Sequence, residues 1–369
     1  MHRLLLGTRK GLFVIDGEGN GDGADWRIAA HHFAGEPVTQ VLPDPQGGAW
    51  YAALRMGHFG VKLRKSLDRG ASWQEIAAPA FPPKPETGAW ADDATPWSVD
   101  MIWALAAGGA DQLGRLWAGC LPAGLFRSDD GGASWALATA LWDKPNRRNW
   151  FGGGYDHAGI HSVRVDPRDA RHVTVAISCG GVWQSRDDGA SWIATTRGMK
   201  AGYVPAESAE NPDVQDPHCL VQCAADPDTL WVQHHDGMYR SGDGGQNWQR
   251  IAPPAPSDFG FAVACDPNDA RRAWFVPAQA DACRIPVGAR MVVNRTDDAG
   301  ASFRTFGAGL PQQHAYHLVY RHGLDVAADG RTLALASTTG GLWVSADAGE
   351  NWQELSRDLP PIAVLRFVR

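Results

Sequence analysis

Thirteen histidines occur in this chain of 369 residues, and several lie close in sequence to aspartate or arginine. Neutral imidazole nitrogens bind Zn, Fe, Cu or Ni, and histidine also transfers protons near neutral pH. Four histidines are candidate ligands of a divalent metal: His161, His218, His234 and His235. No HxH or HExxH phrase accompanies them, so a metal cofactor is one hypothesis among several.

The same histidines also suggest acid–base chemistry in a hydrolytic site. Asp156 and Asp216 each lie near a histidine in the chain, and a histidine–carboxylate pair can transfer protons. The candidate catalytic residues are therefore Asp156, Asp216 and His161. The wider set of candidate ligand-binding residues, in which Arg55 would hold an anion, is Arg55, His58, His161, His218, His234, His235, His317 and Arg321. The plainest alternative is that these histidines cap strands and bridge loops.

The long segments between periodic runs hold further candidates. Asp92 and Asp93 could include a general acid, or could form a solvated loop tip. Arg147 and Arg148 could hold an anionic ligand, or could be surface charges. Loop tryptophans either stack on a sugar ring or anchor the loop to the protein; here they are Trp90, Trp97, Trp142 and Trp150.

The elements that position these residues are set by a repeat. One phrase occurs six times, as SLDRGASW, SDDGGASW, SRDDGASW, SGDGGQNW, TDDAGASF and SADAGENW. Its Ser or Thr and its Asp can hydrogen-bond nearby backbone N–H groups and close a turn, and its Gly supplies a positive φ. The repeated aspartates are therefore predicted to be structural: Asp68, Asp130, Asp187, Asp243, Asp298 and Asp347.

Each phrase follows two alternating runs, and a third run ends before them near Asp-Pro, so the repeating unit has four strands. Such units, repeated radially, are propeller blades. Residues 3–29 supply only three strands, around the degraded phrase GEGNGDGADW, and residues 361–369 form a spare strand. We predict an all-β, seven-bladed β-propeller of four-stranded blades, with residues 1–369 as a single domain. The C-terminal strand is predicted to join the N-terminal blade and close the ring.

The repeated phrase resembles the Asp-box, or BNR, repeat of the sialidase superfamily, and the chain is similar to bacterial proteins described as glycosyl hydrolase or exo-sialidase-like. Because the repeats run along the whole chain, the resemblance covers the whole chain. It implies a propeller like those of sialidases and other glycosyl hydrolases. A working sialidase has an arginine triad, a Tyr–Glu nucleophile pair and an aspartic acid. In sialidases the first arginine of the triad usually lies in an Arg-Ile-Pro sequence before the first repeat, whereas Arg284-Ile285-Pro286 lies in the sixth blade. Tyr203 and Glu207 share a loop, but their spacing alone does not identify a nucleophile pair. The triad and the pair are not identifiable here, so the class of activity stays open.

Loop lengths predict where a ligand binds. In a propeller, the blade-to-blade connections and the middle turn of each blade emerge on one face, around the mouth of the channel. The connections at 78–98, 142–160 and 197–217 are long, whereas the repeated turns are short. Long loops on a rigid scaffold commonly carry function. We therefore expect a small-molecule or glycan site at this His-rich loop face.

Two other classes of function remain open. The propeller could be a non-catalytic binding or assembly scaffold for a protein partner, or a metal-dependent enzyme that uses the histidines at the channel mouth. The net charge of −7 and the absence of a basic run argue against nucleic acid, and no apolar run is long enough for a membrane span. The short apolar run near the N-terminus and six cysteines without a CxxC pair favour a cytoplasmic location with reduced thiols.

Overall fold

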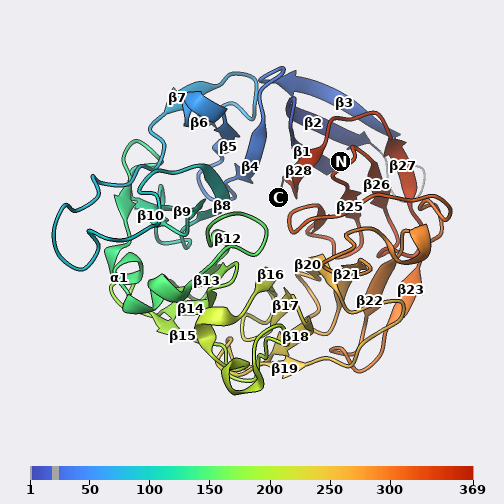
Figure 1. Cartoon of the computed structure of the whole chain (residues 1–369). Coiled ribbons are helices and arrows are strands. Elements are labelled where there is room, and N and C mark those ends of the chain that lie inside the picture. Colours follow the sequence, from blue (N-terminus) through green and yellow to red (C-terminus); the bar gives the residue numbers. More distant parts are fainter. Residues whose placement is uncertain (1, 19–24, 369) are drawn as a thin grey trace. The chain divides into compact units, whose positions relative to one another are not determined.

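The protein is described by a computed structural model over residues 2–18 and 25–368, and its strands form seven antiparallel sheets of four strands each (Figure 1). The chain is a seven-bladed all-β propeller, which confirms the fold predicted from the repeat. Within these residues, the α-helix is the single turn α1 (Thr139–Trp142). No helix in this part of the chain is long and apolar enough to cross a membrane.

The strands follow the chain in blade order, apart from the first blade. The first blade has the order β28 (Ile362–Phe367), β1 (His2–Thr8), β2 (Gly11–Glu18), β3 (Asp25–His32). The second, third and fourth blades consist of β4 (Val38–Pro43), β5 (Trp50–Arg55), β6 (Val61–Ser66), β7 (Gln74–Ile76); β8 (Met101–Ala107), β9 (Leu116–Leu121), β10 (Leu125–Ser128), β11 (Ala136–Leu137); and β12 (Ile160–Asp166), β13 (Asp169–Ile177), β14 (Gly181–Ser185), β15 (Ile193–Ala194).

The last three blades have the same four-strand plan. They consist of β16 (Pro217–Gln222), β17 (Leu230–His234), β18 (Gly237–Ser241), β19 (Gln249–Arg250); β20 (Gly260–Cys265), β21 (Ala273–Pro277), β22 (Val293–Thr296), β23 (Arg304–Phe306); and β24 (Leu324–Val326), β25 (Leu333–Ala336), β26 (Leu342–Ser345), β27 (Gln353–Ser356). Single 3-10 turns lie in the connections at η2 (Gly57–Phe59), η3 (Pro145–Asn149), η4 (Ala206–Ser208), η5 (Pro212–Val214) and η6 (Val287–Ala289).

The structure groups into two compact units. One contains the chain up to Pro43, residues 197–199 and the chain from His218 onward; the other contains residues 44–196 and 200–217. Each unit has its own apolar core. The first core includes Trp274, Trp343 and Trp352, and the second includes Trp117, Trp183 and Trp192.

The first blade combines both ends of the chain, as predicted. Strand β28 pairs antiparallel with β1, with Leu6 opposite Leu365 and Leu4 opposite Phe367 (Figure 1). These four side chains lie in one buried apolar cluster. Residues 19–24 of the degraded phrase GEGNGDGADW lie outside the described residues.

The six repeated phrases form one kind of turn, here called the repeat turn, between the third and fourth strands of their blades. In the fourth blade, the Ser185 hydroxyl accepts from Gly189 N–H at 2.7 Å and donates to Asp187 at 2.8 Å. Asp187 in turn accepts from Ser191 N–H at 2.8 Å. Equivalent hydrogen bonds lower the pKa of Asp68 and of Asp130 to about 2. The aspartates therefore hold turns together, as their repetition predicts.

Removing the buried hydroxyl of a repeat turn should destabilise the protein. Ser185 is 1% exposed, and Ser185→Ala leaves the Gly189 N–H without its acceptor. The loss of such a buried hydrogen bond costs about 1–3 kcal/mol. Urea unfolding should show this loss, with a much smaller effect for Ser191→Ala, whose hydroxyl lies in the exposed part of the same turn. Equal effects of the two substitutions would contradict this role of Ser185.

Candidate functional site

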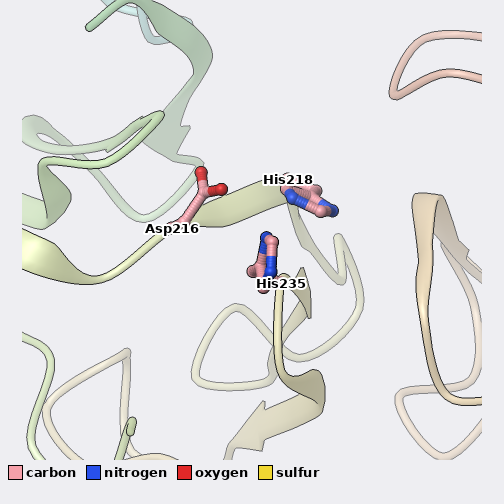
Figure 2. Close-up of side chains that lie close together, drawn as sticks. All are labelled: Asp216, His218 and His235. Atoms are coloured by element: carbon pink, nitrogen blue, oxygen red, sulfur yellow. The ribbon is translucent and has the colours of Figure 1, made fainter. Parts of the chain in front are cut away.

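Three polar side chains converge where β16 begins and β17 ends. Asp216 directly precedes β16, His218 is the second residue of that strand, and His235 follows β17. One carboxylate oxygen and one nitrogen from each imidazole all lie within 4.8 Å of one another. Figure 2 shows the three side chains around one spot. Pro217 alone separates Asp216 from His218, so the strand itself sets the spacing of these two residues.

The carboxylate of Asp216 is buried and held in place. It is 2% exposed, and it accepts hydrogen bonds from the Ser178 hydroxyl and the Cys179 N–H, both at 3.2 Å. Cys179 has a φ of 48°, in the left-handed region, within the turn between β13 and β14. The loop before β12 passes close by, because a Cβ on Gly153 would lie 3.0 Å from Asp216 Oδ2. One segment therefore holds the carboxylate by hydrogen bonds, and a second passes close to it.

The two histidines of the cluster are oriented by their neighbours. His218 Nδ1 lies 2.6 Å from the Gly260 carbonyl oxygen, which can only accept, so Nδ1 carries the proton and Nε2 the lone pair in the neutral ring. The His218 ring stacks on Phe261 at 4.5 Å and 16°. His235 is half-buried, and its ring lies edge-on to Phe259 at 5.8 Å. His235 is therefore the most exposed member of the cluster.

The other two predicted metal ligands lie outside this cluster. His161 is buried, with Nε2 at 2.7 Å from the Pro217 carbonyl oxygen and Nδ1 at 3.0 Å from the Ser162 hydroxyl. It supports the backbone between Asp216 and His218. His234 is also buried, and its Nδ1 accepts from Asp236 N–H at 3.1 Å. Among the described residues, the group that brings three potential ligands together is Asp216, His218 and His235.

Three further candidates from the sequence, Arg55, His58 and Asp156, are exposed side chains. Arg55 forms an exposed ion pair with Asp100 at 2.8 Å, and His58 is exposed in η2. Asp156 is exposed in the loop that contains Gly153. Of the three, Asp156 is the one whose loop passes beside the cluster, since a Cβ on Gly153 would lie 3.0 Å from Asp216 Oδ2.

Two candidates from the C-terminal half lie before β24. His317 Nδ1 contacts the Thr339 hydroxyl at 2.6 Å, and burial lowers the pKa of its imidazole. The Arg321 guanidinium lies 5.8 Å from the centre of the Phe261 ring, which stacks on His218. Of these two, Arg321 is the one connected to the cluster through a shared neighbour.

Arg147, which the sequence suggested as an anion-binding residue, anchors a loop instead. Its guanidinium lies 3.8 Å from the ring centre of Trp142 and 4.1 Å from that of Trp90, and it pairs with Asp93 at 2.7 Å. The side chains of Arg147 and Asp93 are 3% and 6% exposed. Arg148 forms an exposed pair with Asp92. Arg147 and Asp93 therefore hold the 78–98 connection against η3 and are not available to a ligand.

Three exposed aromatic side chains, here called the aromatic rim, belong to the loops before β12 and β16, which both run close to Asp216. They are Phe151, Tyr155 and Tyr203, at 41%, 41% and 39% exposure. Phe151 N–H donates to the carbonyl of Cys179, whose own N–H donates to Asp216. The Phe151 and Tyr203 rings lie edge-on at 6.5 Å. Sequence reasoning considered loop tryptophans for sugar stacking and named Tyr203 only beside Glu207, so it did not group these three side chains.

Two of those loop tryptophans, Trp142 and Trp150, are buried at 1% and 9% exposure. They anchor their loop, which is the alternative that the sequence left open. The signal in the sequence was the run FGGGY at 151–155. In this run Phe151 and Tyr155 flank three glycines, which have no side chains.

Comparison with solved structures finds the same kind of fold. A GH74 enzyme from Niastella koreensis has a TM-score of 0.62 at 17% identity, over 97% of this chain and 52% of that chain. An ancestral GH74 enzyme gives 0.59 at 19% identity, over 89% and 38%. YCF48 from Cyanidioschyzon merolae gives 0.56 at 13% identity, over 88% and 87%.

The present chain thus spans about half of the GH74 enzymes' length or less. At these identities the likeness concerns the fold: a propeller of the kind found in glycoside hydrolases. No protein-family model matches the chain, and neither does any curated protein.

Proposed function

We propose that this protein is a glycosyl hydrolase-like propeller that binds a glycan, or a small molecule of similar polarity, at the Asp216–His218–His235 cluster. The observation that carries the proposal is the position of this buried polar cluster next to the aromatic rim. Burying a carboxylate beside two imidazoles costs free energy, and such clusters recur at functional sites. A few convergent polar groups beside aromatic surface are typical of ligand sites.

The aromatic rim and the cluster supply complementary parts of carbohydrate recognition. The faces of Phe151, Tyr155 and Tyr203 can cover the apolar C–H surface of a sugar ring, while carboxylate and imidazole groups bond its hydroxyls. Cys179 joins the two parts, since its carbonyl holds Phe151 and its N–H holds Asp216. The similarity in fold to the GH74 enzymes is a further reason to test glycans first.

Hydrolysis of a glycosidic bond needs a second carboxyl group about 5–9.5 Å from the first. Asp156, in the loop that also carries Gly153 and Tyr155, is our candidate for this role beside Asp216. Asp156→Asn should then abolish turnover and leave ligand binding nearly unchanged, which separates catalysis from binding.

The proposal is tested by screening the protein, kept in a chelator, against a glycan array and then titrating the strongest glycan. Asp216→Asn should weaken binding at least about tenfold, and Tyr203→Ala about 2- to 12-fold, the range of one aromatic contact. The matched control is Asp187→Asn, which makes the same chemical change in a repeat turn and should bind like the wild type. If no glycan binds, or if Asp216→Asn binds as well as Asp187→Asn, the proposal is wrong and a scaffold function becomes the better hypothesis.

A further inference from the structure

We propose that Asp216, His218 and His235 together bind one divalent transition-metal ion. This inference goes beyond the ligand site proposed above and does not depend on it. Two imidazole nitrogens and one carboxylate oxygen form a donor set suited to Zn²⁺, Fe²⁺, Co²⁺ or Ni²⁺. Ca²⁺ and Mg²⁺ prefer oxygen ligands alone, so this cluster should discriminate against them.

The distances among the three groups suit a shared ion after a small shift of the side chains. With bonds of 2.0–2.2 Å, two ligand atoms of a tetrahedral site are about 3.4 Å apart. The three groups lie within 4.8 Å of one another, so contraction by at most about 1.4 Å brings them to that distance. His235 is the residue able to move, because it lies in a half-exposed turn, whereas Asp216 and His218 are each 2% exposed.

The surroundings of the cluster have the form that supports metal ligands. A ligating histidine typically donates its other N–H to a carbonyl or carboxylate, which fixes the tautomer. His218 does this through Nδ1 to Gly260, which leaves the lone pair of the neutral ring on Nε2. Asp216 receives Ser178 and Cys179 as donors, so its orientation is also set. These contacts are independent of the proximity of the three side chains.

Three protein ligands leave a coordination position for water or for a ligand oxygen, as in catalytic rather than structural zinc sites. His235 is the most exposed of the three side chains. The remaining position would therefore be reached from the side where solvent and a bound molecule can enter.

The test uses full-length protein stripped with a chelator and Zn²⁺ as the probe, in competition with a chromogenic chelator. The wild type should bind one Zn²⁺ per chain, and excess Ca²⁺ should not displace it. His235→Ala and Asp216→Ala should each weaken Zn²⁺ binding at least about 100-fold, more than the 10- to 100-fold typical of outer contacts. Ser178→Ala, which removes such an outer contact, should weaken it about tenfold.

His31→Ala is the matched control, since His31 is an exposed histidine on β3 that bonds the Lys10 carbonyl, and it should bind Zn²⁺ like the wild type. If the Asp216→Ala or Ser178→Ala protein fails to fold, the Zn²⁺ affinity of His235→Ala is the result that tests the inference. The inference is overturned if the wild type binds no stoichiometric Zn²⁺, or if His235→Ala keeps wild-type affinity. Glycan binding is measured in chelator, so failure of one proposal is distinguishable from failure of the other.

Discussion

Ending the chain at Pro361 should abolish the folded protein. The truncation removes β28, the strand that pairs with β1 and completes the first blade. Four of its apolar side chains, Ile362, Val364, Leu365 and Phe367, are no more than 6% exposed. Burying a side chain of this size contributes about 1.5–3 kcal/mol, so the strand supplies about 6–12 kcal/mol as an upper limit. That is comparable with the whole stability of a domain, about 5–15 kcal/mol.

The truncation also removes contacts with the last blade. Leu365 N–H donates to the His322 carbonyl, and Phe367 N–H donates to Asp325, both at 2.9 Å. Soluble yield and the cooperativity of thermal unfolding measure the result. A pair of point variants in the intact chain gives the control: Val364→Asp, at a buried position, should be severely destabilised, and Ala363→Asp, at the exposed position beside it, should not. A truncated chain that melts cooperatively near the wild-type temperature would contradict this assignment of β28.

Replacing Arg147 with alanine should be the most destabilising single change in the long loops. The substitution leaves the Asp93 carboxylate buried without its partner and opens the space between Trp142 and Trp90. Burial alone would raise the pKa of Asp93, but the guanidinium holds it below the usual value. Removing one member of a buried ion pair costs about 3–5 kcal/mol.

Arg148→Ala is the comparison for this prediction. Arg148 is the adjacent arginine, with a side chain 44% exposed that pairs with Asp92 at 78% exposure. An exposed pair contributes less than about 1 kcal/mol. The free energy of unfolding in urea should therefore fall strongly for Arg147→Ala and little for Arg148→Ala. If both variants unfold alike, Arg147 does not anchor the loop.

The fold was predictable because its signals are local and repeated. Each repeat turn carries its own Ser, Asp and Gly, and the structure shows the same hydrogen bonds in turn after turn. The closing strand was predictable for a different reason: residues 3–29 lacked one strand and residues 361–369 had no blade. Both inferences needed only the chain and the geometry of a four-stranded sheet.

The candidate site was predictable only in part. Asp216, His218 and His235 were all candidates, but the sequence grouped His161 and His234 with the two histidines as metal ligands. Consecutive residues at a strand end point to opposite sides, so His234 and His235 cannot both face the same spot. His161 instead supports Pro217, a contact between residues 56 positions apart that no local pattern reveals. The roles of such residues depend on tertiary contacts.

The proposed metal site is tested most directly by an anomalous difference map from crystals of the full-length protein grown with Co²⁺. We expect one strong peak bounded by Asp216, His218 and His235, at about 2.0–2.2 Å from one atom of each. A map with no peak there, or with peaks only at surface histidines or at the repeat turns, would contradict the assignment of this cluster as the metal-binding centre of the propeller.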